Sequence, residues 1–189
     1  MRIALHSCCG PCSIEVVDFH RGGGDEPTLV YFNPNIHPAE EYELRREALA
    51  GFAADAGVPV RELEYDADAW EREVGIHGDD RSARCRACYR LRFEGVARWA
   101  AEHDHGIVAT TLSISPYQDV QAIREELQAA AQRHGLEARF VDHRDSYTQA
   151  TRRSREAGMY RQNFCGCRFS KVEAERGRQA RNDARKGRA

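Results

Sequence analysis

The stretch Ile3-Ala4-Leu5-His6-Ser7-Cys8-Cys9-Gly10-Pro11-Cys12 opens the chain with an apolar run that passes at once into cysteines, a glycine and a proline. A short apolar run bounded by turn residues predicts a buried β-strand. Gly10 and Pro11 break that strand, and a helix is expected to follow them. A strand that leads directly into a helix is typical of the first unit of an α/β fold.

The same alternation continues along the chain. The residues predict further strands at Thr28–Phe32, Val58–Leu63, Ile107–Thr111 and Ala138–Val141. Helical patterns lie between them, from Pro38 to Ala56, after Cys88, and from Pro116 to a stop at Gly135. We therefore expect a three-layer, Rossmann-like fold with a mainly parallel sheet and helices on both faces.

Length and composition set limits on the class of protein. The chain has 189 residues, of which 41% are hydrophobic and 31% charged, as expected of one globular domain. No apolar run approaches the roughly 18 residues of a membrane span, and the N-terminal apolar run is too short for a signal peptide. We expect a cytoplasmic protein with one domain at residues 1–175 and a basic, flexible tail at residues 176–189.

Charge is distributed unevenly along the chain. The net charge of −2 excludes a uniformly basic nucleic-acid coat. However, residues 54–80 carry nine acidic and two basic side chains, and residues 152–189 carry twelve basic and four acidic ones. The basic segment is open to two interpretations, a solvated C-terminal helix or a surface that contacts phosphate groups.

The seven cysteines fall into three tight groups, which are Cys8, Cys9 and Cys12, then Cys85 and Cys88, then Cys165 and Cys167. Clustered thiols in a reducing compartment indicate metal or redox chemistry rather than structural disulfides. Sites in parallel sheets lie at the carboxyl ends of the strands. We therefore expect the three groups to meet at one edge of the sheet.

Two of the groups have spacings suited to metal binding. Cys85 and Cys88 form a CxxC pair at a helix start, so both sulfurs lie on one face. Cys8 and Cys9 can face one centre only where the chain turns, and Gly10 and Pro11 provide that turn. Four thiolates suit either a [4Fe–4S] cluster or a zinc site, and the spacing does not separate these two.

Cys165-Gly166-Cys167 differs in kind. Two cysteines separated by one glycine can close a small, strained and labile disulfide, as expected of a catalytic dithiol, and metal chelation is the alternative. Cys12 is open to three interpretations: a ligand to a second metal, a substitute cluster ligand, or a simple thiol at a helix start. Among the eight histidines, His6 and His37 are candidate proton donors, and we expect the others on the surface or in loops.

Five collinear segments between residues 3 and 170 resemble the QueH type of epoxyqueuosine reductase. They are His6–Cys12, Tyr31–Pro38 with Glu41-Tyr42 and Arg45-Arg46, Cys85-x-x-Cys88-Tyr89, Thr110–Pro116, and Tyr160–Cys167 with Phe169-Ser170. The segments 18–27 and 176–189 lie outside the resemblance. It is far more specific than a single CxxC.

The resemblance implies the last step of queuosine biosynthesis, in which the epoxide of epoxyqueuosine at the tRNA wobble position is reduced to an alkene. It implies a cobalamin-independent enzyme with a HUP-type, nucleotide-binding-like fold. A [4Fe–4S] cluster would be held by Cys8, Cys9, Cys85 and Cys88, and Cys165 with Cys167 would be the redox pair. Some similar proteins have a carboxylate at the position of Cys12, which makes Cys12 a candidate ligand to an additional mononuclear iron.

The implied partner is a tRNA anticodon stem-loop that carries epoxyqueuosine, together with an electron donor that the sequence does not identify. Candidate substrate-binding residues follow the strands and precede the last cysteine pair: Tyr31, Asn33, Asn35, Thr110, Thr111, Tyr117, Tyr160 and Arg161. The three tyrosines are candidates for stacking on a base, and Arg161 with the tail for binding phosphates.

Two other classes of protein compete with this interpretation. An iron–sulfur tRNA thiolation enzyme would need a glycine-rich ATP-pyrophosphate loop after the first strand, where this chain has Ser7-Cys8-Cys9-Gly10-Pro11-Cys12. A non-catalytic RNA-binding domain would use four cysteines only to hold a structural zinc ion.

Overall fold

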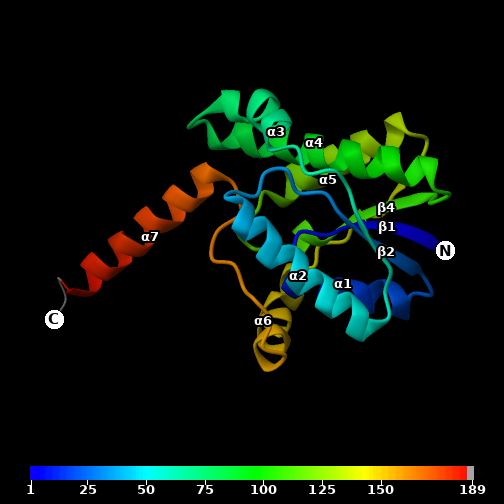
Figure 1. Cartoon of the computed structure of the whole chain (residues 1–189), viewed down its shortest axis with the longest axis horizontal. Helices are drawn as coiled ribbons and strands as arrows, with labels where there is room; N and C mark the ends of the chain where they lie inside the picture. Colours follow the sequence, from blue (N-terminus) through cyan, green and yellow to red (C-terminus); the bar gives the residue numbers. More distant parts are fainter. Residues whose placement is uncertain (187–189) are drawn as a thin grey trace.

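A computed structural model describes residues 1–186 as one sheet and its surrounding helices (Figure 1). The strands are β1 (Arg2–His6), β2 (Glu26–Tyr31), β3 (Val60–Glu62), β4 (Ile107–Thr110) and β5 (Glu137–Ala138). The helices are α1 (Gly10–Gly22), α2 (Ala39–Ala56), α3 (Ala67–Glu73), α4 (Arg81–Glu102), α5 (Val120–Arg133), α6 (Tyr147–Glu156) and α7 (Arg168–Lys186). Short 3₁₀ turns lie at Gly75–His77, Thr111–Ile114 and Arg144–Ser146.

All strand pairs in the sheet are parallel, in the order β3-β2-β1-β4-β5. The chain first builds outward from β1 through β2 to β3 and then crosses to β4 on the other side of β1. The topological switch point therefore lies between β1 and β4, and ligand sites of such sheets form at its carboxyl end. Cys8 and Cys9 leave β1 there, and Thr111 leaves β4 there.

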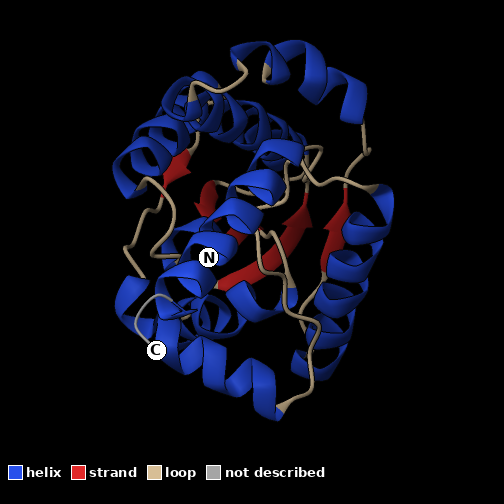
Figure 2. Cartoon of the chain, turned by 90° about the vertical axis from the view of Figure 1, so that its left-hand side faces the viewer, coloured by secondary structure: helices blue, strands red, loops and turns tan. Residues whose placement is uncertain are grey.

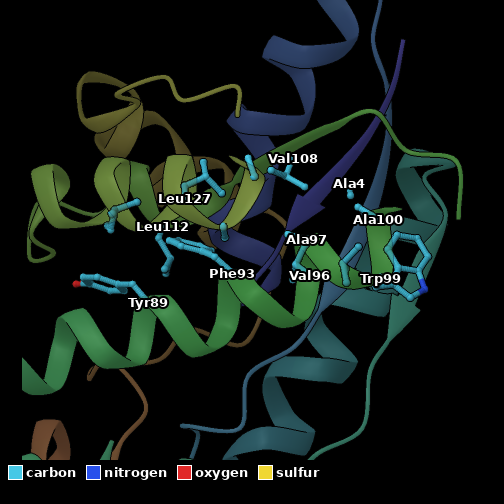
Figure 3. Packing of buried hydrophobic residues seen from close by; sticks show 14 of the residues in the cluster. Ala4, Tyr89, Phe93, Val96, Ala97, Trp99, Ala100, Val108, Leu112 and Leu127 are labelled. Carbon is cyan, nitrogen blue, oxygen red and sulfur yellow. The ribbon is translucent and has the colours of Figure 1, made fainter. Parts of the chain in front are cut away.

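Alternation along the strands produces two cores, one on each face of the sheet. Ile3 and Leu5 of β1 pack with residues of α1 and α2, whereas Ala4 packs on the opposite side with residues of α4 and α5. Figure 2 shows the helices on both sides of the strands. Figure 3 shows Phe93 of α4 beside Leu112 and Leu127, with Val96 further along the same helix. The predicted α/β fold is thus confirmed.

The helix α1 follows the cysteine turn and packs closely on α2. A Cβ atom at Gly10 would lie 2.6 Å from the carbonyl oxygen of Ala48, so only glycine permits this approach. Cys9 is the N-cap of α1 in an extended conformation, and a proline stands in the first turn. These features fix the backbone on which the first cysteine group is carried.

The ends of several predicted strands differ from the structure, and the division into a domain and a tail stays a prediction. The last strand is Glu137–Ala138 rather than Ala138–Val141, because an edge strand pairs on one side only and here bonds just to β4. The expected boundary at residue 175 falls inside α7, which runs from Arg168 to Lys186 and projects away from the sheet (Figure 1). Residues 187–189 of the expected tail lie outside the described residues.

None of the helices described between residues 1 and 186 is both long and apolar enough to cross a membrane. The acidic and basic segments meet at the start of α7. There Arg168 forms an ion pair with Glu71 of α3, and Arg84 of α4 forms one with Glu173. These ion pairs attach the base of α7 to the α3–α4 region.

Candidate metal and redox site

The first cysteine group forms a compact cluster of thiols between β1 and α1. The sulfur atoms of Cys8, Cys9 and Cys12 all lie within 4.8 Å of one another, and those of Cys8 and Cys9 are 3.7 Å apart. Thr111, at the end of β4, contacts this cluster because its hydroxyl lies 3.8 Å from the Cys8 sulfur. The cluster therefore lies at the switch point of the sheet.

The three thiols of this group differ in acidity. Hydrogen bonds from Cys12 and Cys9 hold the pKa of Cys8 well below its usual range. The hydrogen bonds to Cys8 and Cys9, together with burial, raise the pKa of Cys12 well above its usual range. The hydrogen bonds therefore favour the thiolate form at Cys8 over that at Cys12. A cluster of soft sulfur donors fits zinc, iron or an iron–sulfur cluster.

The CxxC pair lies on the first turns of α4. Cys85 packs against the core that contains Cys8 and Cys9, and Cys88 packs with Cys167 around Trp70. The Trp70 indole N–H donates to the Cys88 sulfur at 3.4 Å. Burial raises the pKa of Cys85 to about 12 and that of Cys88 to about 11. Neither sulfur belongs to the 4.8 Å group, so the four-cysteine ligand set stays a prediction.

The Cys165-Gly166-Cys167 segment lies against the loop after β2, and both thiols are free. The backbone N–H of His37 donates to the Gly166 carbonyl at 2.9 Å, and Gly166 has a φ of 138°. Burial and the neighbouring Cys167 raise the pKa of Cys165, whose sulfur accepts a hydrogen bond from Gln118 at 3.4 Å. Cys165 and Cys167 also act electrostatically on the thiol of Cys85. The structure thus places the second and third cysteine groups beside each other.

Several predicted substrate-binding residues are instead part of the scaffold. Tyr31 is fully buried and donates to the Tyr42 carbonyl, so it presents no face to a base, and its prediction as a stacking residue is wrong. Asn33 is buried and its amide N–H donates to the Ser7 carbonyl at 2.9 Å. Asn35 is also buried, but its carbonyl oxygen has no hydrogen-bond partner.

Thr110 and Thr111 support the strand ends. Thr110 accepts a hydrogen bond from the backbone N–H of Leu112 and pairs with the His6 ring at 3.0 Å. Burial and the charge of Arg92 lower the pKa of His6 to about 3, so His6 holds no imidazolium proton at neutral pH. Burial lowers the pKa of His37 as well. His20, which we expected on the surface or in a loop, is instead buried within α1. His105 and His143 lie in loops as expected, and both are buried.

A small cavity of about 60 Å³ opens next to the first cysteine group. Its lining includes Cys12, Arg161, Gln162 and Tyr147. Gln162 donates to the Cys9 sulfur at 2.9 Å, and its buried carbonyl oxygen has no partner. Arg161, a predicted phosphate ligand, thus lines the same cavity as Cys12. The cavity gives a small polar molecule access to Cys12.

The predicted Tyr117 and Tyr160 lie elsewhere around the site. Tyr117 is 71% exposed and meets the Tyr147 ring edge-on at 6.0 Å. The hydroxyl of Tyr160 donates to Glu41, which also binds Arg45. Tyr117 therefore presents an aromatic face to solvent, whereas Tyr160 is tied to α2.

Sequence reasoning assigned no role to four polar residues near the cysteine groups, Arg45, Arg92, Gln118 and Gln162, although Arg45 and Gln162 lie in segments that carry the family resemblance. Arg45 donates to the carbonyls of Cys165 and Phe164. Arg92 had a signal in the local sequence, since it stands four residues after Cys88 and shares its helix face.

Comparison with known proteins identifies the family. A family model described as "Epoxyqueuosine reductase QueH" matches residues 3–173. The chain belongs to this family. This QueH family member is 32% identical over 184 residues to epoxyqueuosine reductase QueH of Haemophilus influenzae, a match that covers 94% of this chain and 75% of the relative. It is 33% identical over 178 residues to the Thermotoga maritima protein of the same description, with 90% and 91% covered.

A solved structure supports the fold of this QueH family member. A protein described as a predicted subunit of tRNA methyltransferase from Methanocaldococcus jannaschii aligns with a TM-score of 0.57 and 14% identity. The alignment covers 82% of this chain and 76% of that protein. At this identity the likeness concerns the fold alone.

Proposed function

We propose that this protein reduces the epoxide of epoxyqueuosine at the wobble position of tRNA, without cobalamin, using an iron–sulfur cluster and a redox dithiol. A tRNA substrate is consistent with a cytoplasmic location. Family membership supports the reductase activity. The observation that carries the proposal is the gathering of three cysteine groups, distant in sequence, around the carboxyl end of one sheet.

The ligand chemistry of the site fits the proposed cofactor. Cys8, Cys9, Cys85 and Cys88 would hold the cluster, with Cys12 left for an additional mononuclear iron. Bound there, iron would supply single-electron transfer and a Lewis acid for the epoxide oxygen. The hydrogen bonds that lower the pKa of Cys8 favour its thiolate, the form of cysteine that binds metal.

The dithiol can supply the electrons and protons that the reaction needs. Converting an epoxide to an alkene requires two electrons and two protons, and the oxygen leaves as water. Cys165 and Cys167 can give up both electrons and both thiol protons when they form a disulfide. A cellular reductant, which we do not identify, must then restore the two thiols. Arg45 holds the backbone of this pair in place through the Cys165 carbonyl.

The RNA is proposed to approach the open side of the site. Tyr117 offers an exposed ring for stacking, a contact worth about 1–3 kcal/mol per base. Arg161 lines the cavity beside Cys12 and would bind a phosphate or the substrate's polar groups. The carbonyl of Gln162, which lacks a partner, can accept a hydrogen bond from a substrate hydroxyl.

The proposal is tested by anaerobic incubation of iron-reconstituted protein with tRNA that carries epoxyqueuosine and a chemical reductant. Nucleoside mass spectrometry should show queuosine appearing as epoxyqueuosine disappears. A brown protein that absorbs near ~400 nm supports the cluster. A colourless protein with stoichiometric zinc and no turnover would instead favour the non-catalytic zinc protein.

The proposal assigns some cysteines to the cluster and others to the redox pair, and this difference can be tested. Cys165→Ser should keep the iron content and visible absorbance of the wild-type protein but lose turnover, because the variant cannot form the disulfide. Cys8→Ser is the matched comparison and should lose iron as well. Loss of the cluster in Cys165→Ser would show that Cys165 is a ligand and not a redox thiol.

A further inference from the structure

Arg92 is a fully buried arginine that lacks the usual partner. Three arginines are each only 1% exposed: Arg45, Arg84 and Arg92. Arg45 pairs with Glu41 and Arg84 pairs with Glu173. Arg92 forms no ion pair with a carboxylate in the part of the chain that the structure describes. Its one hydrogen bond to a side chain goes to Asn33 at 2.6 Å, and its Nε has no partner.

A buried guanidinium without a counter-charge is costly, because burial removes the water that stabilised the charge. The cost is tolerated where an anion lies near. Arg92 stands on α4 four residues after Cys88 and seven after Cys85, on the same face of that helix. Arg92 therefore lies on the face of α4 that carries both thiols of the CxxC pair.

The contacts of Arg92 connect it to the cysteine groups. Arg92 donates to Asn33, and Asn33 donates to the Ser7 carbonyl, directly before Cys8. Cys88 lies about one helical turn before Arg92 on α4 and packs with Cys167. Arg92 is thus linked to the turn that carries Cys8 and to the helix face that meets the last cysteine pair.

We propose that Arg92 is the counter-ion of the metal-binding thiolates and stabilises the net negative charge that they acquire when metal binds. The inference rests on the proposed metal site, since a centre held by four thiolates is anionic. Arg92 is a positioning and charge-compensating residue and makes no contact with the reacting atoms. Its hydrogen bond to Asn33, which donates to the Ser7 carbonyl, holds its guanidinium toward the turn that carries Cys8.

The test uses Co²⁺ as the probe, added anaerobically to the reduced, metal-free full-length protein at constant pH. Binding is followed by the charge-transfer absorption of thiolate-bound cobalt. Arg92→Gln should weaken the apparent affinity about tenfold to a hundredfold, the usual effect of removing a residue that supports metal ligands. Arg92→Lys should stay near wild type because it keeps the charge.

Asn33→Ala is the matched control, since it removes the hydrogen bond and keeps the charge. It should weaken Co²⁺ binding much less than Arg92→Gln does. Arg92→Met, of similar volume, replaces Arg92→Gln if circular dichroism shows that the latter is unfolded. Unchanged affinity in the neutral variant, or a loss in Arg92→Lys or Asn33→Ala as large as that in Arg92→Gln, would overturn the proposal.

A second measurement separates this inference from the proposed activity. In iron-reconstituted protein, Arg92→Gln should shift the reduction potential of the centre to more negative values, because reduction adds negative charge that Arg92 stabilises. Arg92→Lys should restore it. If wild-type protein binds Co²⁺ as described yet never reduces epoxyqueuosine, the reductase proposal fails while the role of Arg92 stands. A potential that does not move in the neutral variant contradicts that role.

Discussion

Gly166 is the residue on which the geometry of the proposed dithiol depends. Its φ of 138° is unfavourable for any residue with a side chain, and an added Cβ would lie 2.9 Å from the Asn35 amide nitrogen and 3.0 Å from Ile36 Cγ1. The segment has little room to adjust, because the Gly166 carbonyl accepts from His37 and its N–H donates to Ser170.

We therefore expect Gly166→Ala to lower the free energy of unfolding by on the order of 1–3 kcal/mol and to reduce turnover strongly. Urea denaturation and the mass-spectrometric assay measure the two effects. Gly51→Ala, within α2 and with open space around the added methyl group, is the control and should stabilise slightly. An unaltered stability and turnover in Gly166→Ala would mean that the dithiol tolerates another backbone conformation.

How much of the site is readable from sequence differs between residues. The turn residues Gly10 and Pro11 predicted that Cys8 and Cys9 can face one centre, and the structure gathers both with Cys12, for which the sequence left three interpretations open. Local spacing carries that information. Tyr31 was misassigned because alternation along β2 fixes only which residues share a face, and its face proved to be the core with α1 and α2. Arg45 donates to the carbonyl of Cys165, which lies 120 positions further along the chain. A local sequence pattern cannot reveal a contact between residues so far apart.

At the scale of elements, the four longest strands and helices such as α5 were predictable, because apolar runs or a helical spacing of apolar residues, together with turn residues at their ends, mark them. The extent of α7 was not, since its sequence is mostly polar. The docking of α2 against the last cysteine pair was not, since it depends on single polar contacts. Arg45 of α2 is buried, binds Glu41 at 2.7 Å and reaches the carbonyls of Phe164 and Cys165. One side chain thereby joins the helix after β2 to the segment before α7.

Removing Arg45 should consequently release this contact between elements. Arg45→Met leaves Glu41 buried without its cation, and such a change costs about 3–5 kcal/mol of unfolding free energy. Arg46→Met is a matched control on the next position, where the partly exposed ion pair with Glu43 contributes only about 0–1 kcal/mol. Urea unfolding of both variants measures the difference. Similar losses of unfolding free energy in the two variants would show that Arg45 does not hold α2 to the last cysteine pair.

At the scale of the whole molecule, the acidic and basic segments of the sequence occupy different helices. The acidic segment lies in and around α3, and the basic segment continues into α7, which projects from the molecule (Figure 1). Arg168 and Glu173 fasten only its first turns to α3 and α4. A projecting basic helix can follow a phosphate backbone while the sheet edge holds the reacting base.

Replacing Arg176, Arg178 and Arg181 by Gln tests this arrangement without cutting the helix or its ion pairs. For every phosphate that an arginine no longer neutralises, the slope of log affinity against log salt should fall by about 0.9 for duplex and about 0.7 for single-stranded RNA segments. Filter binding of the tRNA at several salt concentrations measures the slope, and Glu175→Gln with Asp183→Asn is the control that leaves the arginines intact. The triple variant should bind more weakly at low salt and converge with wild type at high salt, because only the electrostatic part of binding is removed. A slope equal to that of wild type would assign the basic helix to solvent and leave the anticodon to be held by the site alone.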